Sequence, residues 1–382
     1  MKHLLLSAAL AASLILPAYG AEPAPIPSPG EIAAAAPASD WIAIAPTDLL
    51  VMDLAPDARG KARRVVIQLM PAPFSQGWIG NIRKLAAAHW WDGTSVNRVQ
   101  DNYVAQWGDA TEKKVLPKGL VVVPESEYVT TSDAIAAVPS ATTPTDGPAQ
   151  LAFQRTEADL AAKSSSRRSK ADLEKLRVEL PALREAYQLE IDARSKGAQL
   201  SIDSTRTAKA PDGWHERDAY APWVEIHKGW PVAGEQVNDE LWRFWPVHCY
   251  AMVGVGRNMS PDTGNGAELY AVIGHAPRHL DRNIALVGRV ISGIEFLASL
   301  PRGTEALGFY KSAAERVPIK SVRLGSELPA ADQPRFEYLS DSLSFGRYVD
   351  ARANRRDPFF ITPAGGADIC NIPVPVRPVA AK

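Results

Sequence analysis

The amino-acid sequence predicts a mainly β protein whose strands fall into two groups separated by a long insertion. Short aliphatic runs occur at 48–54 (DLLVMDL) and 63–69 (RRVVIQL), and similar runs return between 249 and 325. Runs of this length and composition, bounded by turn residues, are typical of β-strands. Residues 155–196 differ, because their leucines recur at the spacing of one helical face. The insertion is therefore expected to be partly helical.

The overall composition indicates a globular protein of ordinary charge. The chain has 382 residues, 22% of them charged, and a formal net charge of −1. This length allows one to three domains with a sizeable core. The charge balance lacks the basic excess that favours nucleic acid, so no nucleic-acid partner is expected.

The N-terminus has the pattern of a cleavable secretory signal over residues 1–20. Lys2 and His3 precede an apolar run, and Ala18-Tyr19-Gly20 offers small residues for cleavage after Gly20. A buried first helix is the alternative, but Pro17 would end it. No later stretch reaches the ~20 apolar residues of a transmembrane helix, so we expect no membrane span. For a bacterial source, these features predict a periplasmic protein.

The first strand group can be followed element by element. An Asp/Gly turn joins the two aliphatic runs, which predicts a hairpin. From 74 to 89 the apolar residues Trp78, Ile82 and Leu85 occur at i, i+4 and i+7, which predicts a helix. An Asp-Gly turn at 91–94 then leads to two short strands, SVNRV and YVAQWGD.

The insertion begins after these strands. Residues 119–123 (GLVVV) are a candidate strand, and two aromatic-rich segments, 218–232 and 240–250, have the character of a lid and a strand. The helical stripe in 155–196 predicts an amphipathic helix or hairpin that packs on the body of the protein, with a partner-binding arm as the alternative.

Beyond the second strand group, a short helix is expected at 293–303, with Gly303 placed to end it. The tail from 326 is polar, and one helix is expected near 343–355. The chain contains two cysteines, Cys249 and Cys370. In an oxidising compartment they could form a disulfide, and two buried thiols are the alternative.

Several catalytic signatures are absent from the sequence. It contains no G-x-S-x-G elbow, no H-E-x-x-H motif and no Walker glycine loop. Gly254-Val-Gly256 lacks the third glycine of a dinucleotide fingerprint. Pro277 lies between His275 and His279 and prevents the regular helix that would bring them together on a metal. No metal site is expected.

Four successive motifs resemble those of the cyclophilin-type peptidylprolyl cis–trans isomerases. The family has YDG, then a strand ending in F-H-R-V, then F-x-x-Q-G-G-D, and this chain has WDGTSVNRV and YVAQWGD. AMVGVGRNMSPDTGNGAELYAVIG resembles the family's S-M-A-N-A-G-x-N-T-N-G-S-Q-F-F-I. HLDRNIALVGRVISGIEFLASL resembles W-L-D-G-K-H-x-V-F-G-x-V-x-x-G-M-x-V, and VPIKSVRLG is placed like the last strand.

The resemblance implies a closed antiparallel eight-stranded barrel capped by two helices. Its first half would be 41–110 and its second half 247–325, with an insertion at 111–246. A linker at 21–40 and a C-terminal extension at 326–382 would complete the chain.

The resemblance also implies a prolyl groove that works without a cofactor on proline-containing polypeptides. Arg98 occupies the position of the catalytic arginine, and Gln106 matches the glutamine that holds arginine and substrate. On strands, alternation would turn both side chains into one groove. An exposed strand arginine paired with a carboxylate is the structural alternative for Arg98. The further substrate-binding positions carried over from the family are Tyr103, Met252, Val253, Gly254, Glu268, Tyr270 and His279.

This chain departs from the family pattern at several of these positions. Asn97 replaces the histidine before the arginine, and Gly254 replaces an asparagine that clamps the substrate backbone. Trp107 replaces a glycine and is expected to form a wall of the groove. We therefore consider two functions, namely a prolyl isomerase for exported proteins and a catalytically weak binding module or chaperone that acts through the insertion.

Overall fold

A computed structural model describes residues 26–137 and 218–379 of the chain. Both the predicted signal at 1–20, with its cleavage site, and the predicted helical arm at 155–196 lie outside the described residues.

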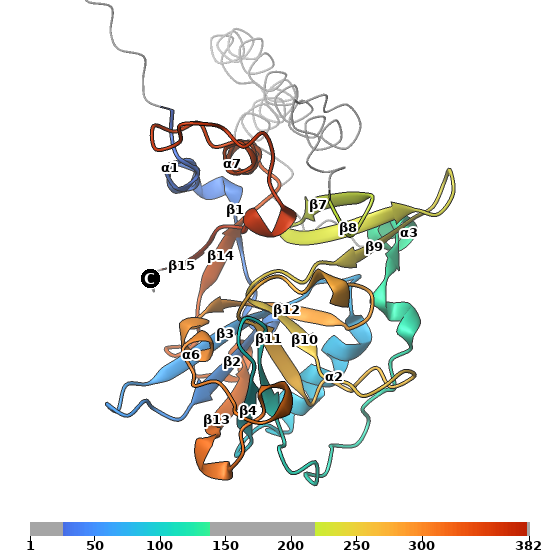
Figure 1. The fold of residues 1–382 in the computed structure, drawn as a ribbon, viewed down its shortest axis with the longest axis vertical. Coiled ribbons are helices and arrows are strands. Elements are labelled where there is room, and N and C mark those ends of the chain that lie inside the picture. Colours follow the sequence, from blue (N-terminus) through green and yellow to red (C-terminus); the bar gives the residue numbers. More distant parts are fainter. Residues whose placement is uncertain (1–25, 138–217, 380–382) are drawn as a thin grey trace, which may run out of the picture.

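The described residues are built around a closed barrel of eight antiparallel strands, as the resemblance implied (Figure 1). Around the barrel the strands follow the order β10-β11-β5-β4-β13-β2-β3-β12. Their bounds are β2 (Leu49–Leu54), β3 (Arg63–Leu69), β4 (Ser95–Val99), β5 (Val104–Gly108), β10 (Met252–Val255), β11 (Leu269–Val272), β12 (Leu286–Ser292) and β13 (Val317–Leu324).

Strands from the two halves of the sequence alternate around the barrel. The predicted hairpin is present as β2 and β3, whose register runs from Leu49 opposite Gln68 to Leu54 opposite Arg63. Strand β5 pairs with β11, β3 with β12, and β4 and β2 both with β13. Because each half fills gaps left by the other, the barrel closes only when both are present, and closure leaves no exposed sheet edge.

Two helices pack their apolar side chains into the barrel core. Helix α2 (Gln76–Ala87) buries the predicted face of Trp78, Ile82 and Leu85 completely. Helix α6 (Glu295–Ala298) is shorter than the 293–303 expected, and it buries Leu297. Figure 1 places α2 and α6 on different sides of the barrel.

The described part of the insertion forms a second, smaller sheet. Its four strands, in the order β6-β9-β8-β7, lie beside the barrel (Figure 1). They are β6 (Thr130–Thr131), β7 (Trp223–His227), β8 (Trp230–Gln236) and β9 (Trp242–Pro246), accompanied by helix α3 (Ser132–Ala137). The two aromatic-rich segments at 218–232 and 240–250 supply β7, β8 and β9, so both contribute strands.

The strand expected at 119–123 does not form. The side chain of Asn81, fully buried in α2, donates to the carbonyl of Val121 and accepts from its backbone nitrogen, each over 2.9 Å. These bonds satisfy the backbone of Val121 as a strand partner otherwise would. Val123 is buried against α2, and Val122 is 95% exposed.

The two ends of the described chain come together in a third sheet, which the sequence did not predict. Strand β14 (Phe336–Leu339) pairs with both β1 (Trp41–Ala43) and β15 (Val376–Pro378). Residues 41–43 therefore belong with the tail and not with the barrel. Helix α7 (Leu343–Ala353) forms where a helix was expected.

The predicted linker at 21–40 also contains structure. Helix α1 (Pro29–Ala34) begins with a capping box between Ser28 and Glu31, and it contacts α7 (Figure 1).

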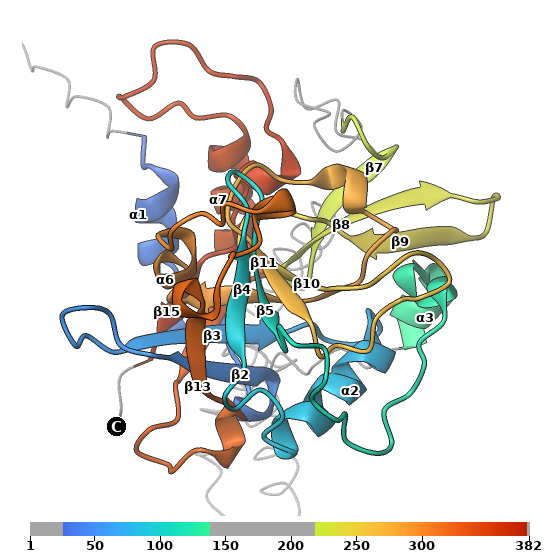
Figure 2. The same ribbon diagram turned by 60° about the horizontal axis from the view of Figure 1, so that its bottom comes forward.

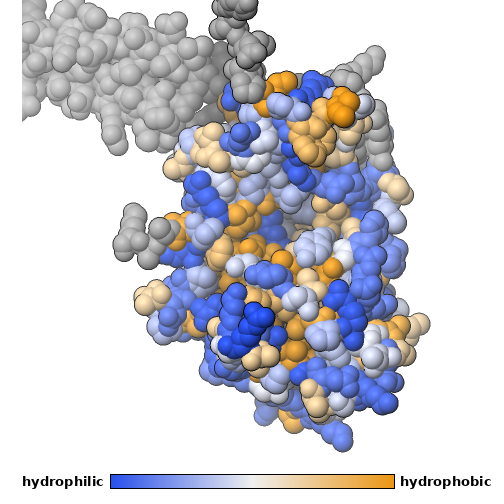
Figure 3. Space-filling model, turned by 60° about the vertical axis from the view of Figure 1, so that its left-hand side comes forward, coloured by the Kyte–Doolittle hydropathy of each residue, from blue (hydrophilic) through white to orange (hydrophobic). Residues whose placement is uncertain are grey.

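Cys249 and Cys370 form a disulfide and are not two buried thiols. The bond ties the tail to the segment before β10. Among the described residues, no helix is long and apolar enough to cross a membrane. On the face drawn in Figure 3, hydrophobic residues are dispersed among hydrophilic ones.

Candidate active site

A β-bulge in β4 positions the two predicted catalytic side chains. Val96 lies opposite Trp107 and Arg98 opposite Gln106, so Asn97 is an extra residue without a partner in β5. Val96 and Val99 point into the core, where both are fully buried. The bulge therefore turns Asn97 and Arg98 outward together and brings Arg98 beside Gln106. Figure 2 turns this face of the barrel forward.

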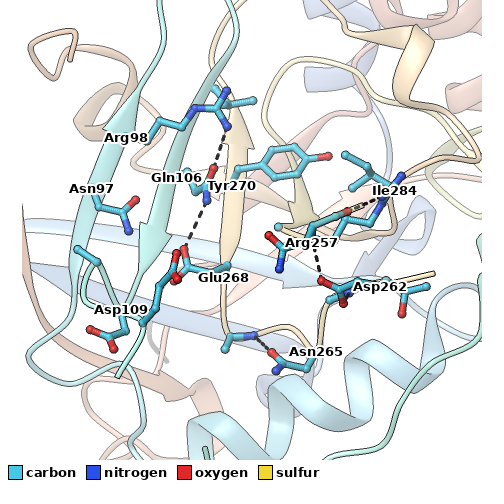
Figure 4. A pocket seen from close by; sticks show the side chains of 18 of the residues that line it. Asn97, Arg98, Gln106, Asp109, Arg257, Asp262, Asn265, Glu268, Tyr270 and Ile284 are labelled. Carbon is cyan, nitrogen blue, oxygen red and sulfur yellow. Dashed lines mark hydrogen bonds between the residues drawn. The ribbon is translucent and has the colours of Figure 1, made fainter. Parts of the chain in front are cut away.

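The guanidinium of Arg98 is held on three sides. Its Nη1 donates to Oε1 of Gln106 over 3.0 Å, its Nη2 to Oε1 of Gln100 over 2.5 Å, and its Nε to the carbonyl of Leu307 over 2.7 Å (Figure 4 draws the bond to Gln106). Burial lowers the pKa of Arg98, yet an arginine stays charged at neutral pH. Three of its five N–H groups thus bond to described residues, which leaves two free to donate to a ligand.

Aromatic rings lie close to the guanidinium. The Cζ atom of Arg98 is 5.7 Å from the ring centroid of Tyr103 and 5.5 Å from that of Phe309. These distances allow cation–π attraction, which helps to fix the orientation of the guanidinium. The arrangement differs from the structural alternative for Arg98, because the guanidinium donates to two side-chain amides and a backbone carbonyl and not to a carboxylate.

Sequence reasoning missed the segment that supplies Leu307 and Phe309. Residues 303–310 follow the outer edge of β4, where the backbone nitrogen of Gly303 donates to Val99 and that of Tyr310 donates to Asn97. Phe309 also forms an isolated bridge with Arg98. The segment carries no motif, and a backbone carbonyl acts without any side-chain identity, so no sequence signal marked it.

Glu268 lies on the other side of Gln106. Its Oε2 accepts from Nε2 of Gln106 over 3.5 Å (Figure 4). A Cβ on Gly108 would lie 1.9 Å from Oε1 of Glu268, so the glycine makes room for this carboxyl. Burial raises the pKa of Glu268 to about 6, although hydrogen bonds from Gln106 and Asn97 oppose the rise. The site therefore contains a carboxyl group that changes charge close to neutral pH.

An apolar pocket lies beside this polar row. Tyr270 on β11 packs with Tyr103, Val104 and Ile284, and its own ring is 4% exposed. The ring also covers Gly254, because a Cβ there would lie 2.3 Å from Cζ of Tyr270. A proline ring fits such a surface, since it is apolar and donates no hydrogen bond.

The row of polar side chains formed by Arg98, Gln106 and Glu268 and the apolar pocket belong to one continuous groove of about 800 Å³. The predicted site residues that line it are Arg98, Tyr103, Gln106, Glu268 and Tyr270. His279 is exposed next to the groove, and its ring stacks on Tyr103 at 6.5 Å between centroids.

Four residues differ from their expected places in the groove, and Gly254 is one of them, because it is buried beneath the Tyr270 ring and does not line the groove. Met252 and Val253 are buried in the barrel core and do not line it. Trp107 does not form a wall, because it follows Gln106 on β5 and alternation turns its ring into the core, where it is 1% exposed. Within the described ranges, no cluster of three or more histidine, cysteine, aspartate or glutamate side chains could hold a metal ion.

The architecture is similar to that of a solved structure, cyclophilin AquaCyp293 from Hirschia baltica. The two chains superpose with a TM-score of 0.54 over 90% of this chain and 94% of that one, at 17% sequence identity. The chain has the cyclophilin fold. Because the match covers 90% of the chain, the likeness to this cyclophilin extends beyond the barrel strands.

A second solved structure is less similar. A cyclophilin-type peptidyl-prolyl cis–trans isomerase from Cryptosporidium parvum, crystallised in the presence of the dipeptide Ala-Pro, matches 72% of this chain at 9% identity with a TM-score of 0.30. No protein-family model matches the sequence, and no curated protein matches it. The structural comparison therefore shows the cyclophilin fold of this chain, whereas the comparisons of its sequence find no match.

Proposed function

We propose that this chain is a peptidylprolyl cis–trans isomerase that acts on extended, proline-containing polypeptides. One observation carries the proposal: Arg98 is preorganised by Gln106, Gln100 and the Leu307 carbonyl at the edge of an apolar pocket. Rotation about an X–Pro bond faces a barrier of about 18–20 kcal/mol, because the nitrogen lone pair is delocalised into the carbonyl.

The geometry supports a mechanism without a nucleophile. As the peptide bond twists, the prolyl nitrogen becomes pyramidal and its lone pair localises. A guanidinium N–H that donates to this lone pair favours the twisted state over either planar state, which lowers the barrier. The apolar pocket would hold the proline ring while the residue before it turns. Because Arg98 is fixed before substrate arrives, little reorganisation accompanies the step.

The same proposal includes a role in the folding of exported proteins. The signal-like residues 1–20 and the Cys249–Cys370 disulfide support it, since disulfides persist mainly in oxidising compartments such as the periplasm.

Steady-state isomerisation of a short X–Pro peptide tests the proposal. We expect catalysis by the wild-type chain and a fall in kcat/KM of about a hundredfold in Arg98→Ala, as for the loss of a preorganised donor. Arg64→Ala is the matched control, because Arg64 is also a strand arginine of the barrel but pairs with Asp53 on β2, remote from the groove. Equal activity in the two variants would refute the assigned role of Arg98.

A binding or chaperone function through the insertion is the second candidate. The covered Gly254 favours it, because the groove lacks the side-chain amide that clamps substrate in the family pattern. This function predicts that Arg98→Ala leaves the suppression of client aggregation unchanged, whereas deletion of 150–210 abolishes it. A deletion variant that still suppresses aggregation would count against it.

A further inference from the structure

A row of buried polar side chains runs from the apolar pocket into the interior. The hydroxyl of Tyr270 lies 2.9 Å from Nε2 of His248, and Nδ1 of His248 lies 2.9 Å from Oδ1 of Asp281. His248 is completely buried. It comes from the segment between β9 and β10, whereas Tyr270 is on β11, so the contact joins two parts of the chain behind the groove.

The proton positions along this row follow from its acceptors. Oδ1 of Asp281 accepts from the backbone nitrogen of His248 as well as from Nδ1, so Nδ1 carries a hydrogen. Burial lowers the pKa of His248, which keeps the imidazole neutral. Its Nε2 is then an acceptor, and the Tyr270 hydroxyl donates to it.

Arg278 extends the row to the insertion. Its Nε donates to Oδ2 of Asp281 over 2.7 Å, while Nη1 and Nη2 donate to the two oxygens of Asp218 over 2.7 and 2.8 Å. The side chains of Arg278 and Asp218 are 2% and 3% exposed. Tyr220 stacks on the guanidinium at 5.1 Å. Breaking a buried pair of this kind leaves an uncompensated charge, so the pair strongly restrains both segments.

Two walls of the groove depend on this row. The hydrogen bond to His248 holds the Tyr270 ring over Gly254. The ring lies so close to Gly254 that a Cβ at this position would clash with it. Arg278 begins the short helix Arg278–Leu280, whose Leu280 lines the groove and whose His279 stacks on Tyr103. The residues that anchor Arg278 therefore also fix the position of these two side chains.

We propose that His248, Asp281, Arg278 and Asp218 form a positioning network that sets the shape of the apolar pocket. Through Asp218, the returning end of the insertion becomes part of the substrate-binding apparatus. The inference rests on the proposed isomerase function and adds positioning residues to it. The network contacts the pocket walls and not Arg98, so it acts on substrate binding more than on the rotation step.

Two variants separate the network from general stability. Tyr270→Phe keeps the ring and removes the bond to His248. Asp218→Asn breaks the ion pair with Arg278. Asp357→Asn is the matched control, because Arg355 binds both oxygens of Asp357 and stacks on Phe360 at 4.4 Å, in the tail and away from the groove. Circular dichroism and Tm establish folding, and the isosteric Tyr270→Phe provides a test if Asp218→Asn does not fold.

The measurement is the KM and kcat for a short X–Pro peptide. We expect Tyr270→Phe and Asp218→Asn to raise KM by roughly three- to tenfold, the effect of about one hydrogen bond, with kcat within about twofold of wild type. Asp357→Asn should leave both constants unchanged. Unchanged KM in both network variants, while Arg98→Ala loses activity, would overturn the network and leave the isomerase function intact. An equal rise of KM in Asp357→Asn would also overturn it, because the effect would then reflect stability alone.

A wild-type chain without catalysis would refute the isomerase function first. In that case the Kd of the same peptide is measured by calorimetry instead of KM. Tyr270→Phe and Asp218→Asn should then raise the Kd, and Asp357→Asn should leave it unchanged. Absence of wild-type peptide binding would overturn the network as well.

Discussion

Arg98 and Gln106 face each other across β4 and β5, and Nη1 of the arginine donates to Oε1 of the glutamine over 3.0 Å. The pairing depends on the bulge at Asn97, which lets two consecutive side chains of β4 point outward. Gln106 in turn donates to Glu268, so an arginine, an amide and a carboxyl form one row along the groove.

The first prediction concerns Gln106. Gln106→Leu keeps the size of the side chain but removes the acceptor for Nη1, so Arg98 is less restrained. We expect kcat/KM for an X–Pro peptide to fall about tenfold, which corresponds to about 1.4 kcal/mol.

Gln68→Leu is the matched control for this prediction. Gln68 accepts from Nε of Arg289 over 2.9 Å between neighbouring strands β3 and β12, a Gln–Arg pair like that in the groove. This variant should lower the free energy of unfolding yet leave kcat/KM of the folded protein unchanged. If both leucine variants lose activity alike, the Gln106 pair has no special role.

The second prediction concerns the pH dependence of stability through Glu268. Burial raises its pKa from the ordinary 4.5 to about 6, so the folded state holds the proton more tightly than the unfolded state. Stability from this group is therefore greatest below pH 4.5 and declines as the pH rises through 6. Because one pKa step corresponds to about 1.4 kcal/mol, ionised Glu268 costs about 2 kcal/mol at pH 7.

Glu268→Gln isolates this effect from the other titrating groups. The difference in free energy of unfolding between variant and wild type, from urea denaturation, should become more favourable to the variant by about 2 kcal/mol between pH 4.5 and pH 7. A difference that stays constant with pH would contradict the burial of this carboxyl.

The third prediction concerns Gly254. A Cβ there would lie 2.3 Å from Tyr270, whose ring is tied to His248. Gly254→Ala should lower the free energy of unfolding by about 1–3 kcal/mol, the usual cost of overpacking. Gly346→Ala provides the opposite case, since this helical glycine of α7 has open space around it. The variant should raise the free energy of unfolding by roughly 0.5–1 kcal/mol. Thermal denaturation of the two variants distinguishes them by sign.

The fourth prediction concerns the disulfide. Cys249 and Cys370 are 121 positions apart, so their bond restricts a long loop of the unfolded chain. Replacing both by serine should lower the free energy of unfolding by about 2–4 kcal/mol. A reductant should reproduce this loss in the wild-type chain and have no effect on the double variant. A wild-type Tm that is insensitive to reductant would show that the bond adds little.

The barrel could be predicted from the sequence because four motifs occur along the chain in the order in which the cyclophilin-type isomerases have them. The resemblance placed nine residues in the site: Arg98, Tyr103, Gln106, Glu268 and Tyr270 line the groove, whereas Met252, Val253, Gly254 and His279 do not. Trp107 was misplaced, because a comparison of side-chain size ignores that the residue after Gln106 must point into the core.

Other features depend on contacts that no local pattern records. The carbonyl of Leu307 and the ring of Phe309 come from a segment without a motif. His248 meets Tyr270 only because the chain folds back behind β11. Strands β1, β14 and β15 are three or four residues long, and each becomes a strand only when its distant partner is present.

The most direct test of the central claim is exchange NMR of an Ala-Pro peptide with a catalytic amount of the protein. If Arg98 lowers the barrier to rotation, cis–trans exchange cross-peaks should appear with the wild-type chain and with Arg64→Ala, and they should vanish with Arg98→Ala. Exchange no faster with the wild-type chain than in buffer, or equally fast with Arg98→Ala, would contradict the account.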